Sequence, residues 1–153
     1  MPISAQRVKN GTVKACMMSK VFFDTNILIY AYDEHSMRKR DACRSLLETA
    51  KAKGNGVLST QVLQEFFVAS TGKLGMSPFL SKEALDAFDF MEAVTLDTRL
   101  IKAAVDCHIL SKVSFWDALI IVAAESARCE ILWSEDLNPG QIIRGVRIEN
   151  PLK

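Results

Sequence analysis

The 153-residue sequence has little histidine, no paired cysteine motif and no long apolar segment. Its two histidines, His35 and His108, lie far apart in the chain, which argues against a histidine-based metal site and a Ser-His-Asp triad. The four cysteines form no C-x-x-C pair, so free thiols in a reducing compartment explain them better than disulfides or a zinc site. No apolar run approaches the roughly twenty residues of a membrane span, and no secretory leader is evident. We therefore expect a cytoplasmic protein that does not enter a membrane.

The sequence also lacks an excess of charge of either sign. Its formal net charge is +1, which gives no global attraction to nucleic acid or to membranes. Nucleic acid is not excluded, because a local patch or a bound metal ion can supply a positive field. The hydrophobic share of 49% is enough for a core, and the length fits one domain. We expect a flexible N-terminal extension over residues 1–19 and a single domain over 20–153, with Met1, Met17 and Met18 as alternative translation starts.

Short apolar segments alternate with longer helical ones through the rest of the chain. This alternation predicts a three-layer α/β/α sandwich with a short, mainly parallel central sheet. Ser81 and Thr60 are expected to cap two of the helices, and Thr25 or Asn26 to cap the first. The predicted strands are 21–24, 57–59, 93–96, 130–133 and 142–148, the last of them interrupted at Gly145. The predicted helices are 25–31, 37–53, 61–71, 81–91, 98–110 and 115–128.

Four acids interrupt apolar segments at comparable places in this pattern. Asp24 ends the first apolar strand, within the sequence VFFDTNILIYAYD, and Asp136 follows a later strand. Glu65 and Asp117 lie within the first two turns of apolar helices. Ligands of parallel sheets bind at the carboxyl ends of the strands. We therefore expect the four acids to lie near one another.

A buried carboxylate without a partner costs several kcal/mol or takes up a proton. The apolar segments around Asp24, Glu65 and Asp117 contain no Lys or Arg that would neutralise them. Several carboxylates without cations indicate a hard divalent ion, Mg²⁺ or Mn²⁺. Each acid also has a simpler explanation: Asp24 as a helix cap, Asp117 in a capping box with Ser114, Glu65 paired with a distant Arg, and Asp136 as a turn residue. The metal hypothesis depends on all four together.

The same residues resemble a family. Asp24-Thr25-Asn26 after a strand, Glu65 in an apolar helix, Ser-Phe-Trp-Asp-Ala-Leu-Ile at 114–120 and Ser-Glu-Asp-Leu at 134–137 together resemble a PIN domain. Within that group the chain is most similar to VapC-type toxins of prokaryotic toxin–antitoxin systems. The resemblance covers about residues 19–150, and no acidic position of the motif is substituted.

This resemblance implies a metal-dependent endoribonuclease that leaves 5′-phosphate and 3′-hydroxyl ends. Mg²⁺ or Mn²⁺ would be bound by the catalytic acids Asp24, Glu65, Asp117 and Asp136. Ser134 would support metal-bound water and Asn26 would orient the acids, while Asp97 and Glu135 rank lower as ligands. The resemblance further implies RNA as the substrate, a homodimer, and a small antitoxin protein as partner.

Other functions remain open at this point. A PIN nuclease of RNA maturation or DNA processing would have no antitoxin, and a nucleic-acid-binding PIN module would have no catalytic activity. A haloacid-dehalogenase-like phosphatase requires Asp-x-Asp at the first strand, where this chain has Asn26 as the third residue. For RNA contacts the basic candidates are Arg38, Lys39, Arg40, Lys73 and Lys82, although an ordinary solvated charged face explains each of them more simply. The apolar helices around 62–70 and 80–91 offer surface to a partner.

Overall fold

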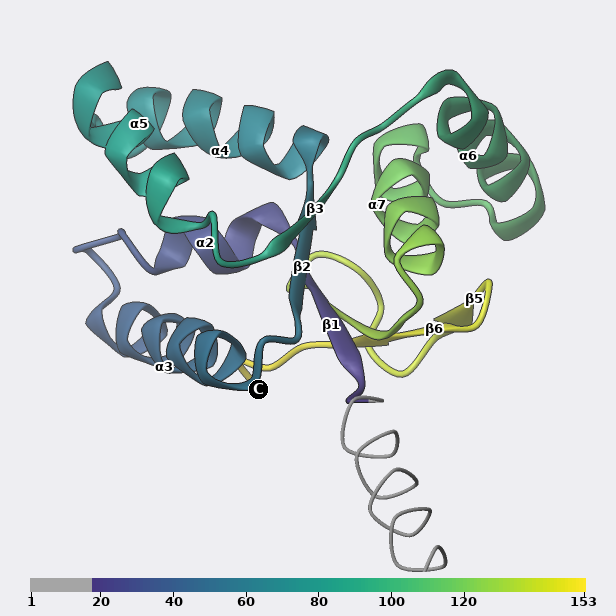
Figure 1. Cartoon of the computed structure of the whole chain (residues 1–153), viewed down its shortest axis with the longest axis horizontal. Coiled ribbons are helices and arrows are strands. Elements are labelled where there is room, and N and C mark those ends of the chain that lie inside the picture. The colour runs from purple at the N-terminus through teal and green to yellow at the C-terminus, as the bar shows by residue number, and fades with distance from the viewer. Residues whose placement is uncertain (1–17) are drawn as a thin grey trace, which may run out of the picture.

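The centre of the molecule is a six-stranded sheet with the strand order β3-β2-β1-β4-β6-β5 (Figure 1). The computed structural model describes residues 18–153. β1 runs parallel to β2 and β4, the outer pairs β2–β3 and β4–β6 are also parallel, and β5 is antiparallel to β6. The prediction of an α/β fold with a mainly parallel sheet is thus confirmed. The strands are β1 (Lys20–Phe23), β2 (Gly56–Ser59), β3 (Glu92–Val94), β4 (Cys129–Trp133), β5 (Ile142–Ile143) and β6 (Val146–Glu149).

Helices cover both faces of this sheet. From β1 the chain moves to β2 and then to β3, and it returns past β1 to reach β4. Right-handed crossovers place helices on opposite faces when the direction of travel reverses. Figure 1 accordingly shows α6 and α7 on one side of the sheet and the earlier helices on the other. The helices are α2 (Thr25–Tyr30), α3 (Met37–Lys53), α4 (Thr60–Gly72), α5 (Pro78–Ala87), α6 (Thr98–Ser111) and α7 (Phe115–Ser126).

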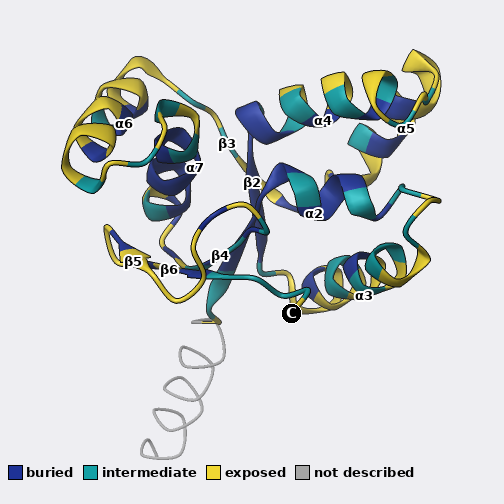
Figure 2. Cartoon of the chain, turned by 180° about the vertical axis from the view of Figure 1, so that it is seen from behind, coloured by how far each residue is buried: buried dark blue, intermediate teal, exposed yellow. Residues whose placement is uncertain are grey.

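The core lies where the central strands meet α7 and α2. Phe22 and Phe23 of β1 and Leu132 of β4 are fully buried, and the run from Ala118 to Ala124 in α7 is buried without interruption. Figure 2 shows this buried material around the central strands. Strands buried on both faces read as continuous apolar runs, which explains the sequence of β1. The end of β1 is therefore a rigid position at the centre of the sheet.

Several predicted details differ from the structure. The strand expected over 142–148, with its interruption at Gly145, is the hairpin β5–β6, which turns at Arg144 and Gly145 with φ of 52° and 79°. Positive φ at both central residues is the requirement of a two-residue hairpin turn of type I′. α5 is capped by Ser77 ahead of Pro78 and not by Ser81, which is buried and bonded to the Ser70 hydroxyl. Proline at the first helical position sets this earlier start.

Two more caps lie one residue earlier than predicted. Ser59, not Thr60, accepts the N–H of Val62 at the start of α4. Asp24, not Thr25 or Asn26, caps α2, as the simpler explanation of this acid expected. Ser59 is the last residue of β2, and Asp24 directly follows the last residue of β1. The strand-to-helix turns are therefore shorter than the sequence pattern indicated. The second correction moves a site residue into the cap itself.

The expected extension over residues 1–19 falls almost entirely outside the described residues, as do Met1 and Met17. At the end of that segment, the Ser19 carbonyl accepts a 2.9 Å hydrogen bond from the Asn55 side chain. The assignment of 20–153 as a single domain stays a prediction. Between residues 18 and 153 no single helix is long and apolar enough to cross a membrane. α6 and α7 meet that criterion only as a pair bent by 115°, by length and composition.

Candidate active site

Asp24 is held between the two central strands. Its backbone N–H donates to the carbonyl of Trp133 at the end of β4, at 3.0 Å. Oδ1 accepts the Thr25 N–H at 2.7 Å, and Oδ2 accepts the Ser134 hydroxyl at 2.7 Å. The residue is only 7% exposed. Both carboxylate oxygens are thus fixed by neutral donors, which orient the side chain without neutralising its charge.

Ser134 connects Asp24 to the turn that carries Asp136. This serine is fully buried, and its hydroxyl oxygen lies 3.3 Å from the Asp136 N–H and 3.4 Å from the Leu137 N–H, both of which it accepts. The turn after β4 therefore wraps around one hydroxyl group. Asp136 itself is exposed at that turn. The predicted supporting role of Ser134 corresponds, in this geometry, to holding two of the predicted acids in place.

Glu65 is positioned by Gln61, which the sequence analysis did not name, and by Thr25, which it named only as a cap candidate and as part of the Asp-Thr-Asn motif. Oε2 accepts the Thr25 hydroxyl at 2.6 Å, and Oε1 accepts the Gln61 amide at 2.8 Å. Thr25 is the residue directly after Asp24, so α2 links the first acid to the second. Gln61 lies four residues before Glu65, and that helical spacing was the signal that could have identified it. Asn26, which was expected to orient the acids, forms no side-chain hydrogen bond with the other described residues.

Asp117 lies in the first turn of α7, half-buried. Its backbone N–H donates to the Ser114 hydroxyl at 3.1 Å, which confirms the serine cap predicted at 114. Gln61 joins this turn to α4, because its amide also donates to the Trp116 carbonyl at 3.2 Å. The Gln61 side chain thus links Glu65 to the main chain next to Asp117. No hydrogen bond connects the Asp117 carboxylate to the other predicted acids.

The electrostatics of the site centre on Asp24. Burial raises the pKa of its carboxyl from the ordinary 3.8 to about 6. The hydrogen bonds from Ser134 and Thr25 oppose this shift, whereas the charges of Glu65 and Asp136 add to it. Three of the four predicted acids therefore act on one another at the carboxyl edge of the sheet.

Cations do not balance these charges within residues 18–153. None of the ion pairs in that range involves Asp24, Glu65, Asp117 or Asp136. The described residues also contain no group of three side chains already assembled around a metal position. The donor chemistry nevertheless fits a hard divalent ion, because every available ligand is a carboxylate oxygen.

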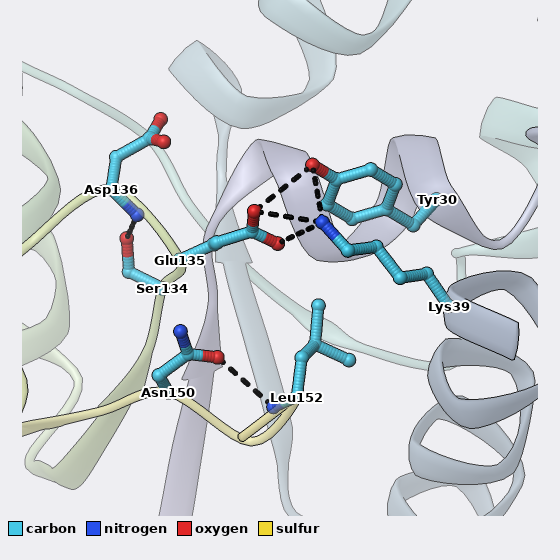
Figure 3. Close-up of polar contacts among 7 residues, drawn as sticks. All are labelled: Tyr30, Lys39, Ser134, Glu135, Asp136, Asn150 and Leu152. Atoms are coloured by element: carbon cyan, nitrogen blue, oxygen red, sulfur yellow. Dashed lines mark hydrogen bonds and ion pairs between the residues drawn. The ribbon is translucent and has the colours of Figure 1, made fainter. Parts of the chain in front are cut away.

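The lower-ranked acids are engaged elsewhere. Asp97 caps α6 by accepting the Leu100 N–H at 2.9 Å. Glu135 lies between Ser134 and Asp136 but pairs with Lys39 of α3 at 2.9 Å and accepts the Tyr30 hydroxyl at 3.2 Å. Figure 3 shows the Asp136 carboxylate pointing away from this ion pair. The Lys39–Glu135 pair therefore anchors the outer side of the turn and leaves Asp136 available.

The comparisons with known proteins identify the family of the chain. The model of the PIN domain family matches residues 21–142. The chain therefore belongs to the PIN domain family. No curated protein matches it at a significant level.

Solved structures of low sequence identity share the fold. The DNA-bound VapBC of Salmonella typhimurium has a TM-score of 0.65 and 21% identity, covering 88% of this chain and 99% of that one. A toxin–antitoxin complex from Klebsiella pneumoniae has a TM-score of 0.65, 19% identity and coverages of 86% and 98%. VapC20 of Mycobacterium tuberculosis, a Sarcin-Ricin loop cleaving toxin, has a TM-score of 0.63, 16% identity and coverages of 76% and 92%. The predicted likeness to VapC-type PIN domains is confirmed at the level of fold.

Proposed function

We propose that this protein is a Mg²⁺- or Mn²⁺-dependent endoribonuclease and the toxin component of a type II toxin–antitoxin pair. The observation that carries the proposal is the buried Asp24 carboxylate, which faces the charges of Glu65 and Asp136 and has no cationic partner among the described residues. Membership of the PIN family and the toxins among the similar structures support it. The acids would then serve a ligand and not the stability of the fold.

Each residue has a part in this proposal. The four acids Asp24, Glu65, Asp117 and Asp136 would hold the divalent ion. When bound, such an ion neutralises the charge of the phosphodiester and activates water at neutral pH. Ser134 keeps the Asp24 carboxylate in one orientation. Thr25 and Gln61 limit the positions of Glu65, so that it approaches the other acids along one path.

Cleavage of RNA tests this assignment. Purified protein should cut single-stranded RNA in Mg²⁺ or Mn²⁺ and not in EDTA, leaving 5′-phosphate and 3′-hydroxyl ends. Single-stranded DNA in a parallel reaction examines the alternative of a DNA-processing nuclease. Failure to bind any divalent ion in calorimetry, together with retained RNA binding, would favour the non-catalytic module.

As a toxin, the protein is also proposed to form a homodimer. Phe67 and Val68 of α4 are exposed apolar side chains, and so is a stripe formed by Val105 and Ile109 of α6. Exposed apolar surface of this kind is typical of protein interfaces. We assign the α6 stripe to a homodimer contact in the cytoplasm. Light scattering should then give a dimer mass for the wild type and a monomer mass for Val105→Glu.

An antitoxin has a separate test. Expression of the protein alone should arrest growth, and co-expression of the small gene next to it should relieve the arrest. Relief without physical association would contradict direct inhibition by the antitoxin. Arrest that persists in the Asp24→Asn variant would contradict toxicity through the acidic site. A PIN nuclease of RNA maturation would instead leave growth unchanged on expression.

A further inference from the structure

We infer that a pocket beside the acids binds one unpaired nucleobase of the RNA substrate. This inference rests on the proposed function and specifies how that site would recognise its substrate. The pocket has a volume of about 360 Å³. It lies where the starts of α4 and α7 meet the segment between β3 and α6. Its principal lining residues are Gln61, Gln64, Leu96, Ile101, Phe115 and Trp116.

The pocket offers an aromatic surface that the core does not use. Trp116 is 64% exposed, although tryptophan is costly to leave in water. Its ring contacts Phe115 edge to face, with centroids 5.3 Å apart. Phe115 packs against the core and so limits the movement of the indole. Single-stranded RNA is recognised largely through bases that stack on such side chains.

The lining is uncharged and carries amides. None of the residues around the pocket is Lys, Arg, Asp or Glu, so the pocket suits an uncharged group and not a phosphate. Gln64 is exposed on α4 and presents both a donor and an acceptor. A nucleobase has a flat apolar face and an edge of donors and acceptors, which matches this combination.

The side chain of Gln61 indicates that the occupant of the pocket is a base and not an apolar side chain from a second copy of the protein. Its amide nitrogen donates to Glu65 and to the Trp116 carbonyl, which fixes the orientation of the amide. Its oxygen Oε1 is then buried without a hydrogen-bond partner, and it is the one such side-chain atom within residues 18–153. Buried acceptors normally have donors. The ring N–H or amino group of a base would supply one once the side chains that cover Oε1 move to admit it.

Gln61 also connects the pocket to the acidic residues of the candidate active site. Through its two hydrogen bonds it touches Glu65 directly and the main chain next to Asp117. A base in the pocket would therefore place its own sugar and phosphate beside these acids. The pocket would select which phosphodiester bond is cut, and an abasic nucleotide at that position would be bound poorly.

Steady-state kinetics on an RNA oligonucleotide containing the mapped cleavage site test this inference. Trp116→Ala should raise KM by roughly 5- to 150-fold, the range expected for loss of one stacked base, with kcat changed by less than about threefold. Trp116→Phe keeps an aromatic ring and should restore most of the affinity. Ile142→Ala is the matched control, because Ile142 is similarly exposed at 65% but lies on β5 at the far edge of the sheet.

Fluorescence gives an independent reading of stacking. The chain has two tryptophans, so Trp133→Phe leaves Trp116 as the sole emitter. In the Asp24→Asn background, which prevents cleavage, the oligonucleotide should quench this emission. A copy that is abasic at one nucleotide next to the cleaved bond should quench it far less.

The outcomes separate the two proposals. If the wild type cleaves RNA while Trp116→Ala leaves KM and quenching unchanged, the pocket inference is wrong and the nuclease assignment stands. If no RNA is cleaved, the nuclease assignment fails, and comparison of Trp116 quenching by a single-stranded oligonucleotide with quenching by its fully abasic counterpart still decides the pocket. If Trp116→Ala converts a dimer to a monomer without altering RNA affinity, the pocket belongs to a contact between copies and the inference is overturned.

Discussion

The Ser134 hydroxyl donates a 2.7 Å hydrogen bond to Oδ2 of Asp24, a residue 110 positions earlier in the chain. The same hydroxyl oxygen accepts the Asp136 N–H. One buried side chain therefore sets the orientation of a carboxylate at the end of β1 and the start of the turn after β4. Together with the parallel pairing of β1 and β4, this contact fixes the positions of Asp24 and Asp136.

Replacement of this serine tests the contact. Ser134→Ala removes the donor to a buried carboxylate and leaves two N–H groups without their acceptor. We expect a loss of about 1–3 kcal/mol in the free energy of unfolding and a shift of the pH–rate profile to higher pH. Denaturant unfolding and activity between about pH 5 and 8 provide the two measurements. Ser126→Ala, which removes a local bond to the Ala123 carbonyl, is the control. Equal effects of the two variants would contradict the role given to Ser134.

The raised pKa of Asp24 predicts how stability depends on pH. The folded protein holds a proton on this carboxyl up to about pH 6, whereas the unfolded chain releases it near 3.8. The carboxylate therefore opposes folding progressively as the pH rises between these values, and the full cost of roughly 3 kcal/mol applies above them. Asp24→Asn should stabilise the metal-free protein at about pH 7.5 and have little effect near pH 4. Greater stability of the wild type at pH 7.5 would refute the prediction.

Thr25 is predicted to act by positioning Glu65. Thr25→Val keeps the shape of the side chain but removes the hydroxyl that contacts Oε2. We expect kcat to fall roughly 10- to 100-fold, because small displacements of catalytic groups have effects of that size. Thr25→Ser keeps the hydroxyl and should remain close to wild type. If both variants behave alike, the hydroxyl contact has no part in catalysis.

Lys39 is predicted to hold Glu135 away from the acids. Lys39→Met leaves the Glu135 charge unpaired beside Asp136 and adds to the repulsion of RNA. The variant should show a higher KM at low salt, with a smaller difference at high salt, where charges are screened. The double variant Lys39→Met/Glu135→Gln should recover most of the loss, and Lys39→Arg should lose little. An additive double variant would show that Lys39 acts independently of Glu135.

Local sequence signals were sufficient for most of the fold. The helix expected over 37–53 matches α3 in full, because its apolar spacing and the glycine after it define both ends. β1 and β4 are found within one residue of their predicted starts, since buried parallel strands are continuous apolar runs. The hairpin at 144–145 was missed because Arg144 adopts a positive φ, which its residue type does not favour.

The site was only partly readable from the sequence, because its contacts join distant elements. The sequence predicted acids at the carboxyl edge of the sheet, and the placement of Asp24 and Asp136 at neighbouring strand ends follows from the parallel pairing of β1 and β4. The contact between Thr25 and Glu65 depends on how α4 packs against α2, which no local pattern encodes. Asp117 is connected through the Trp116 carbonyl, a backbone group that carries no residue-specific signal.

Calorimetric titration of the metal-free protein with Mn²⁺ tests the central claim most directly. The account predicts binding by the wild type, loss of that binding in Asp24→Asn, and retention in Glu83→Gln, which removes an exposed acid on α5 outside the site. RNA cleavage should follow the same order across the three proteins. Binding of equal strength by Asp24→Asn, or none by the wild type, would contradict a metal site at the end of β1.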